Sequence, residues 1–258
     1  MTTIAAVLAG SIGVATVLLG AVRAQAQQQT VTNIVLVHGA FADGSSWGKV
    51  IPILEARGFN AVAVQNPLTS LSDDVNATRR IIALQDGPVI LVGHSWGGAV
   101  ITEAGDDPKV AGLVYVAAYV PDAGASANDT SEPYGLTPGQ KSIQVDAQHF
   151  ARMSSEGIIN HFAQELPMPE RRVVAAVQGQ TYGPMFDEKL THAAWKSKPS
   201  WHVISMKDQT LTHAMEEAGA KKAGGKPIPL QTCHVAMLQE PEKVADVITE
   251  AARGAAKH

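Results

Sequence analysis

The chain has 258 residues, of which 45% are hydrophobic and 17% charged, with a formal net charge of −4 and a sequence pI near 6.1. This length and composition fit one large α/β domain and exclude wholesale disorder. The absence of any basic run argues against nucleic acid as a partner. The single cysteine, Cys233, excludes an intramolecular disulfide and a Cys-rich zinc site.

The first residues differ in character from the rest of the chain. Residues 4–22 form an uncharged run of Ala, Val, Leu and Gly, and an Ala-Gln-Ala sequence at 24–26 supplies the small residues that signal peptidase requires. We therefore predict a signal peptide over residues 1–26, cleaved after Ala26, and a periplasmic or secreted mature protein with no stable membrane association. A retained membrane anchor is the alternative, because the run is long enough to span a bilayer.

Short apolar strands alternate with helices along the rest of the chain. Strands are predicted where continuous apolar runs are bounded by turn residues, at 32–37, 60–64, 88–92, 110–116, 200–206 and 228–232. Helices are predicted at 47–57, at 73–84, from Ala99 onward, and at 241–253. Strands that are apolar on both faces and alternate with helices indicate a mostly parallel sheet flanked by helices. The predicted fold class is therefore α/β, in a single domain over residues 27–258.

The pattern changes between about residues 119 and 198. This stretch is polar and rich in proline and glycine, with helical spacing at 141–154 and 170–178 and no convincing strand. It leaves the sheet after one strand and returns at the next. We therefore expect a helical lid over the carboxyl edge of the sheet, where open α/β sheets bind their ligands.

A Gly-His-Ser-Trp-Gly motif at residues 93–97 falls between the strand at 88–92 and the helix from Ala99. Such a turn is so tight that its flanking positions tolerate little beyond glycine, and it exposes the serine hydroxyl in strained backbone geometry. We therefore predict Ser95 as a nucleophile. Because a serine hydroxyl is a poor nucleophile until a base takes its proton, a base is required nearby.

His234 follows the last predicted strand and precedes the last helix, which places it on the same sheet edge as Ser95. We predict this histidine, among the nine present, as the base. Its imidazole needs a carboxylate to fix the tautomer and stabilise the charged form. Asp208, after the strand at 200–206, is the predicted acid, and it gives the chain order Ser, Asp, His that accompanies such a nucleophile turn. Asp122, after an earlier strand, is the competitor.

An oxyanion formed by attack of the serine needs N–H donors that do not move. The amide of Trp96 lies at a helix N-terminus directly after Ser95, and a second donor should come from the loop after the first strand. Gly39 permits close approach in that loop, so we predict the amide of Phe41 as the second donor, with Ala40 next. The substrate pocket is predicted to be lined by residues from the same two loops, namely His38, Gly39, Ala40, Phe41 and Trp96.

Three segments together resemble the α/β-hydrolase superfamily: Val-Leu-Val-His-Gly at 35–39, Gly-His-Ser-Trp-Gly-Gly at 93–98 and Cys-His-Val-Ala-Met-Leu at 233–238. Over residues 31–253 the sequence is similar to secreted bacterial esterase-like hydrolases related to hydroxynitrile lyases and plant methylesterases. The resemblance implies a triad of Ser95, His234 and Asp208, a backbone oxyanion hole, and neither metal nor organic cofactor. Asn-Pro-Leu-Thr-Ser at 66–70 replaces the Asp-x-x-Gly-x-Gly turn frequent in the family, which should alter one pocket wall.

These residues favour hydrolysis of a small-molecule carboxylic ester through an acyl-enzyme on Ser95. A C–C or hydroxynitrile-type lyase is the alternative, since it would use the same serine and histidine as a proton relay, and Lys207 is the candidate for the lysine that often accompanies that chemistry. A ligand-binding sensor on a vestigial site is the non-enzyme alternative, because one scaffold hosts many functions. The sequence determines neither the acyl group nor the oligomeric state.

Overall fold

The computed structural model describes residues 31–255, and the signal peptide predicted at residues 1–26 lies outside them. Six strands form one parallel sheet in the order β2-β1-β3-β4-β8-β9, which confirms the mostly parallel α/β fold. Their bounds agree with the predicted ones to within two residues. They are β1 (Asn33–Val37), β2 (Asn60–Ala63), β3 (Val89–His94), β4 (Val110–Val116), β8 (Ser200–Ser205) and β9 (Lys226–Leu230).

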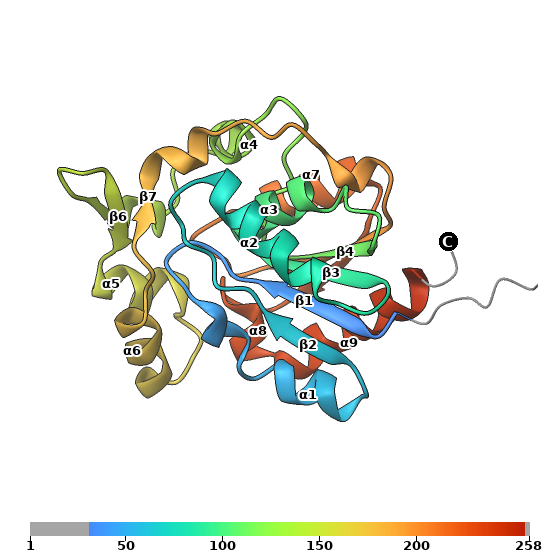
Figure 1. Ribbon diagram of the computed structural model, residues 1–258. Coiled ribbons are helices and arrows are strands. Elements are labelled where there is room, and N and C mark those ends of the chain that lie inside the picture. Colours follow the sequence, from blue (N-terminus) through green and yellow to red (C-terminus); the bar gives the residue numbers. More distant parts are fainter. Residues whose placement is uncertain (1–30, 256–258) are drawn as a thin grey trace, which may run out of the picture.

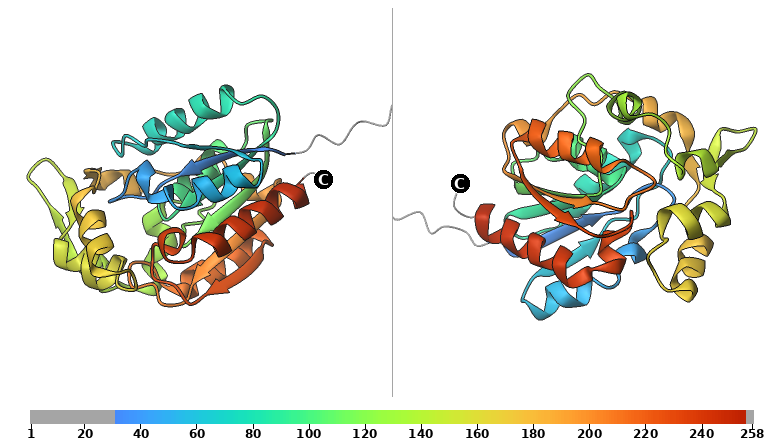
Figure 2. Two further views of the ribbon diagram at one scale, coloured as in Figure 1. Left: turned by 90° about the horizontal axis from the view of Figure 1, so that it is seen from below. Right: turned by 180° about the vertical axis from the view of Figure 1, so that it is seen from behind.

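Helices cover both faces of this sheet (Figure 1). One face carries α2 (Leu71–Ala83), α3 (Gly97–Ala104) and α7 (His213–Ala223). The other carries α1 (Ile51–Ala56), α8 (Ala236–Gln239) and α9 (Pro241–Ala255). Figure 2 shows the sheet between these two layers. Within residues 31–255, no helix is both long and apolar enough to span a bilayer.

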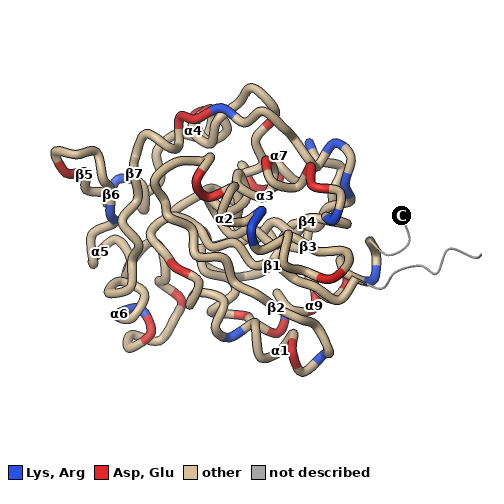
Figure 3. The backbone as a smooth tube through the Cα atoms, in the orientation of Figure 1, with Lys and Arg blue, Asp and Glu red and all other residues tan. Residues whose placement is uncertain are grey.

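The central strands β1, β3 and β4 form the core of the domain. They are buried along almost their entire length because helices cover both faces. Figure 3 shows that these three strands carry no charged residue, and that the charged residues lie elsewhere along the backbone.

Parallel pairing brings the carboxyl ends of the strands to one edge of the sheet. Val37 of β1 lies beside Gly93 of β3, and His94 at the end of β3 lies beside Val116 of β4. Val116 in turn pairs with Val203 of β8. The loops that follow these strands therefore meet at the edge where the sequence predicts the functional site.

The segment between β4 and β8, residues 117–199, lies at this edge and is called the insertion below (Figure 1). Its α-helices are α4 (Ala127–Ser131), α5 (Ser155–Gly157) and α6 (Met168–Ala176), and α6 corresponds to the helix predicted at 170–178. The insertion also contains an antiparallel sheet of β5 (Ile143–Val145), β6 (Phe150–Met153) and β7 (Thr181–Tyr182).

The helix predicted over residues 141–154 is wrong, because this stretch forms the β5–β6 hairpin. The Asp146 carboxylate accepts hydrogen bonds from two backbone N–H groups within the turn, at 2.8 and 2.9 Å. His149 completes the turn with a positive φ of 66°. A side chain that satisfies backbone donors locally competes with helix formation. The expectation that the insertion contains no strand is wrong for the same reason, and β7 then extends the hairpin into a sheet.

Candidate active site

Ser95 stands on the turn between β3 and α3, where its backbone has a positive φ of 53°. Gly93 and Gly97 lie so close to neighbouring backbone atoms that a side chain would not fit at either position. A Cβ on Gly93 would lie 2.5 Å from the carbonyl oxygen of Gly97, and a Cβ on Gly97 would lie 2.5 Å from the carbonyl oxygen of Val37. This close packing holds the serine backbone in a conformation that L-residues rarely adopt.

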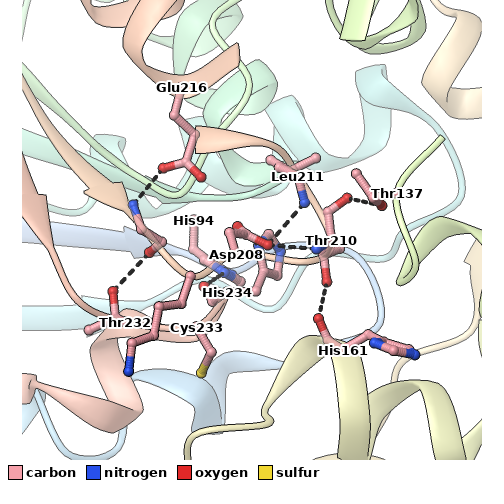
Figure 4. Close-up of polar contacts among 12 residues, drawn as sticks. His94, Thr137, His161, Asp208, Thr210, Leu211, Glu216, Thr232, Cys233 and His234 are labelled. Atoms are coloured by element: carbon pink, nitrogen blue, oxygen red, sulfur yellow. Dashed lines mark hydrogen bonds and ion pairs between the residues drawn. The ribbon is translucent and has the colours of Figure 1, made fainter. Parts of the chain in front are cut away.

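His234 follows β9, and its fully buried side chain contacts Asp208, which follows β8. Nδ1 of His234 lies 2.6 Å from Oδ2 of Asp208, whose side chain is also fully buried (Figure 4). Oδ1 of Asp208 accepts hydrogen bonds from the backbone N–H groups of Thr210 and Leu211, at 2.6 and 3.0 Å. An ionised carboxylate only accepts, so Nδ1 of His234 carries the proton and Nε2 keeps its lone pair. This Nε2 is buried and has no hydrogen-bond partner among the described residues.

His94 connects the loop of His234 to the turn of Ser95. Its Nε2 lies 3.0 Å from the carbonyl oxygen of His234, and the two imidazole centroids are 4.7 Å apart. Burial lowers the pKa of His94 well below its ordinary value, so the ring is neutral and Nε2–H is the donor. Ser95 Oγ and His234 Nε2 share no hydrogen bond in the described chain. In enzymes without substrate such contacts are often long, and they tighten in the reacting complex.

Asp122 and Lys207, the two alternatives considered from the sequence, lie elsewhere. The Asp122 carboxylate pairs with Lys196 at 2.7 Å and lies 3.8 Å from Lys222, on the surface of the protein. Lys207 pairs with Glu165 at 2.8 Å and is half-exposed. The structure therefore brings Asp208 to His234 and leaves Asp122 away from it.

The backbone N–H groups of Ala40 and Trp96 donate to no acceptor within residues 31–255. The amide of Phe41, predicted as the second oxyanion donor, donates instead to Oγ1 of Thr181 at 3.2 Å. Thr181 belongs to β7 in the insertion, so no local sequence pattern predicts this contact. Of these two predicted donors, the amide of Ala40 is therefore the one that has no acceptor among the described residues.

The indole of Trp96 is anchored by Asp74, a buried residue of α2 that sequence reasoning did not assign to the site. Nε1–H of Trp96 donates to Oδ2 of Asp74 at 2.7 Å, and Oδ1 accepts the N–H of Leu68 at 2.8 Å. Burial raises the pKa of Asp74 to about 6, although both hydrogen bonds favour its charged form. Acidic residues in a first helical turn are ordinarily explained by the helix dipole. Only the tertiary contact therefore identifies Asp74.

A cavity of about 350 Å³ opens onto Ser95. From the sheet edge it is lined by Ala40, Phe41, Ser95, Thr210 and Leu211. From the insertion it is lined by Tyr119, Asn128, Leu136, Gln140, Ile143, Val145, Phe162 and Phe186. None of these side chains carries a charge, and most are apolar. Among residues 31–255, no group of three His, Cys, Asp or Glu side chains is arranged to hold a metal ion.

Three of the predicted pocket residues, His38, Gly39 and Trp96, are buried and do not line this cavity. Nδ1 of His38 lies 2.8 Å from the carbonyl oxygen of Gly39, and Nε2 accepts the N–H of Asn66 at 2.9 Å. Burial lowers the pKa of His38, which acts as a neutral ring that holds two loops together. None of residues 66–70 lines the cavity, so the expectation that this segment alters a pocket wall is wrong.

A model of the alpha/beta hydrolase family matches residues 34–247, and the chain belongs to this family. It is 26% identical to a pyrethroid hydrolase of Sphingobium wenxiniae, over 89% of this chain and 90% of that protein. It is 28% identical to Methylesterase 8 of Arabidopsis thaliana, over 73% of this chain and 76% of that protein. The crystal structure of a pyrethroid hydrolase from Sphingobium faniae aligns with a TM-score of 0.76 at 25% identity, over 89% of this chain and 100% of that chain. Relatives named hydrolase and methylesterase support ester hydrolysis in general.

Proposed function

We propose that this protein is a serine hydrolase that cleaves a neutral carboxylic ester through an acyl-enzyme on Ser95. The observation that carries the proposal is the fully buried contact between His234 Nδ1 and Asp208 Oδ2, 2.6 Å long, at the sheet edge that also holds Ser95. A carboxylate in this position fixes the imidazole tautomer that leaves Nε2 able to accept a proton.

The proposed reaction begins when Ser95 Oγ attacks the ester carbonyl carbon and its proton passes to Nε2 of His234. Asp208 stabilises the imidazolium that forms. The N–H groups of Ala40 and Trp96 donate to the developing oxyanion. Collapse of the tetrahedral intermediate breaks the ester bond, and His234 gives its proton to the departing alkoxide. Water, activated by the same histidine, then attacks the acyl-enzyme, which releases the carboxylic acid and restores the Ser95 hydroxyl.

The cavity wall supports an uncharged substrate with apolar substituents. A charged group placed there would lose its hydration without gaining a partner, which is costly. The aromatic and aliphatic side chains of the wall would instead gain from covering apolar surface of the substrate. Lys207 does not line the cavity, so no observation here favours the lyase alternative.

Covalent labelling of Ser95 tests the proposal directly. Treatment with a fluorophosphonate followed by mass spectrometry should give one adduct, on Ser95. Ser95→Ala should lose that adduct and lower the turnover of short-chain p-nitrophenyl esters by roughly 10⁴-fold or more. Ser72→Ala, at an exposed position of α2, is the matched control and should leave both unchanged. An adduct on another residue, or normal turnover by the Ser95 variant, would place the reaction elsewhere.

A further inference from the structure

Glu216 of α7 is a buried carboxyl that the proposed reaction does not use. Its residue is 2% exposed, and Oε2 accepts a hydrogen bond from the N–H of Ser205 at 2.9 Å. Oε1 is buried without a hydrogen-bond partner in the described chain. The neighbouring Asp208 raises the pKa of this carboxyl, both through its charge and through a hydrogen bond between the two side chains. Figure 4 shows Glu216 above the pair formed by Asp208 and His234.

Two neighbouring buried carboxyl groups are not both ionised, because the two negative charges repel each other and neither carboxylate is hydrated. Asp208 accepts hydrogen bonds from three donors, the two N–H groups of Thr210 and Leu211 and the ring of His234. Glu216 accepts only one, from Ser205. Hydrogen bonds to a carboxylate stabilise its charged form, so Asp208 keeps the charge and Glu216 holds the proton.

The other titratable groups near Glu216 favour the same assignment. Burial raises the pKa of Glu216 well above its ordinary value, and the charge of Asp208 raises it further. The charge of Glu217, its exposed neighbour on α7, also raises the pKa of Glu216. Burial raises the pKa of the thiol of Cys233, the residue before His234, and this thiol is therefore neutral. Among the described residues, no cationic side chain forms an ion pair with Glu216.

We propose that Glu216 is a protonated positioning residue whose Oε1–H donates a hydrogen bond to Asp208 and holds that carboxylate against His234. The inference rests on the proposed roles of Ser95, His234 and Asp208. A proton on Oε1 satisfies the one oxygen that otherwise has no partner, and it gives Asp208 a fourth donor. Through Ser205 the same side chain also fixes the end of β8, from which the Asp208 loop departs.

Two substitutions of Glu216 test the proton and the hydrogen bond. Glu216→Gln keeps an oxygen for the Ser205 N–H and an N–H donor for Asp208. It should therefore hold kcat/KM within about threefold of wild type and leave the acid limb of the pH–rate profile unmoved. Glu216→Ala removes both bonds and should lower kcat by about tenfold or more with little change in KM, because the loss falls on the reacting groups. Glu217→Gln, one residue further on, is the matched control and should change neither parameter.

An ionised Glu216 would give different results. Its replacement by Gln would then remove a negative charge beside the His234–Asp208 pair and move the acid limb to lower pH by about one unit, which would overturn the proposal. Wild-type kcat in Glu216→Ala would also overturn it.

Infrared spectroscopy separates this proposal from the proposed function. At pH 8, where Asp74 is ionised, a protonated-carboxyl C=O band should be present in the wild type and in Ser95→Ala and absent in Glu216→Gln. No such band in the wild type refutes the protonated Glu216, whatever reacts at Ser95. The band without a fluorophosphonate adduct on Ser95 refutes the hydrolytic function and retains the proton on Glu216.

Discussion

The carboxyl edge of the sheet and the insertion enclose one cavity, but they are built differently. At the sheet edge, Ser95, His234 and the side chain of Asp208 are buried, and close backbone contacts leave no room for side chains at the glycines around the serine. The insertion contributes most of the cavity wall from short helices, loops and strand β5, and two of its lining residues, Leu136 and Val145, are 73% and 60% exposed. The sheet edge therefore holds the three groups that we propose to react. The insertion supplies surface that can change without disturbing them.

Loss of the buried acid should have the largest effect, because it acts on the sheet edge. Asp208→Asn should lower kcat on the order of 10³- to 10⁴-fold toward p-nitrophenyl esters, since an amide no longer holds the Nδ1–H tautomer of His234. Asp122→Asn is the control, because that carboxylate pairs with surface lysines and should change stability or activity little. A larger loss of kcat in Asp122→Asn than in Asp208→Asn would instead assign the role of the acid to Asp122, in the loop after β4.

The carboxyl of Asp74, which holds the indole of Trp96 beside Ser95, should make the stability of the protein depend on pH. Its pKa is raised to about 6 by burial, from an ordinary 3.8. Between these pH values the folded protein holds a proton that the unfolded chain has lost. The contribution of Asp74 to the free energy of unfolding therefore declines as pH rises through this window and is constant above it. Asp74→Asn does not titrate. The stability of the wild type relative to this variant should therefore fall by about 1–3 kcal/mol between pH 4 and 6.5.

Urea unfolding at a series of pH values measures this difference. Asp73→Asn is the control from the same helical turn, because hydrogen bonds from Thr69 and Ser70 lower the pKa of exposed Asp73. Relative to that variant the wild type should not lose stability as pH rises. A difference between wild type and Asp74→Asn that stays constant with pH would show that burial does not perturb Asp74.

A change in the insertion should have the smallest effect and a different signature. Leu136→Ala removes apolar wall from the cavity and should raise KM for hexanoyl esters about threefold to tenfold. We expect kcat to stay nearly unchanged, because the groups proposed to react lie at the sheet edge. Leu84→Ala, at a similarly exposed leucine outside the cavity, is the matched control. A fall in kcat without a change in KM would mean that the insertion positions the reacting groups.

Local sequence pattern determined the architecture of this protein and the position of its site. Apolar runs set the six strands of the parallel sheet. Parallel pairing then brings every residue that follows a strand to one edge, so Ser95, Asp208 and His234 could be assigned to that edge before any contact was known. Their chemical roles stay predictions, to be decided by the substitutions above.

Only the tertiary structure decided the contacts that surround these residues. The Phe41 amide is engaged by Thr181, 140 positions away in the chain, and Trp96 is held by Asp74, 22 positions away. In the sequence, Glu216 cannot be distinguished from an exposed polar residue of a helix. Only the structure shows that it is buried near Asp208. Periodicity reports which face of an element is apolar. It does not report which distant donor or carboxyl will meet a given atom, because burial and packing between elements set those distances.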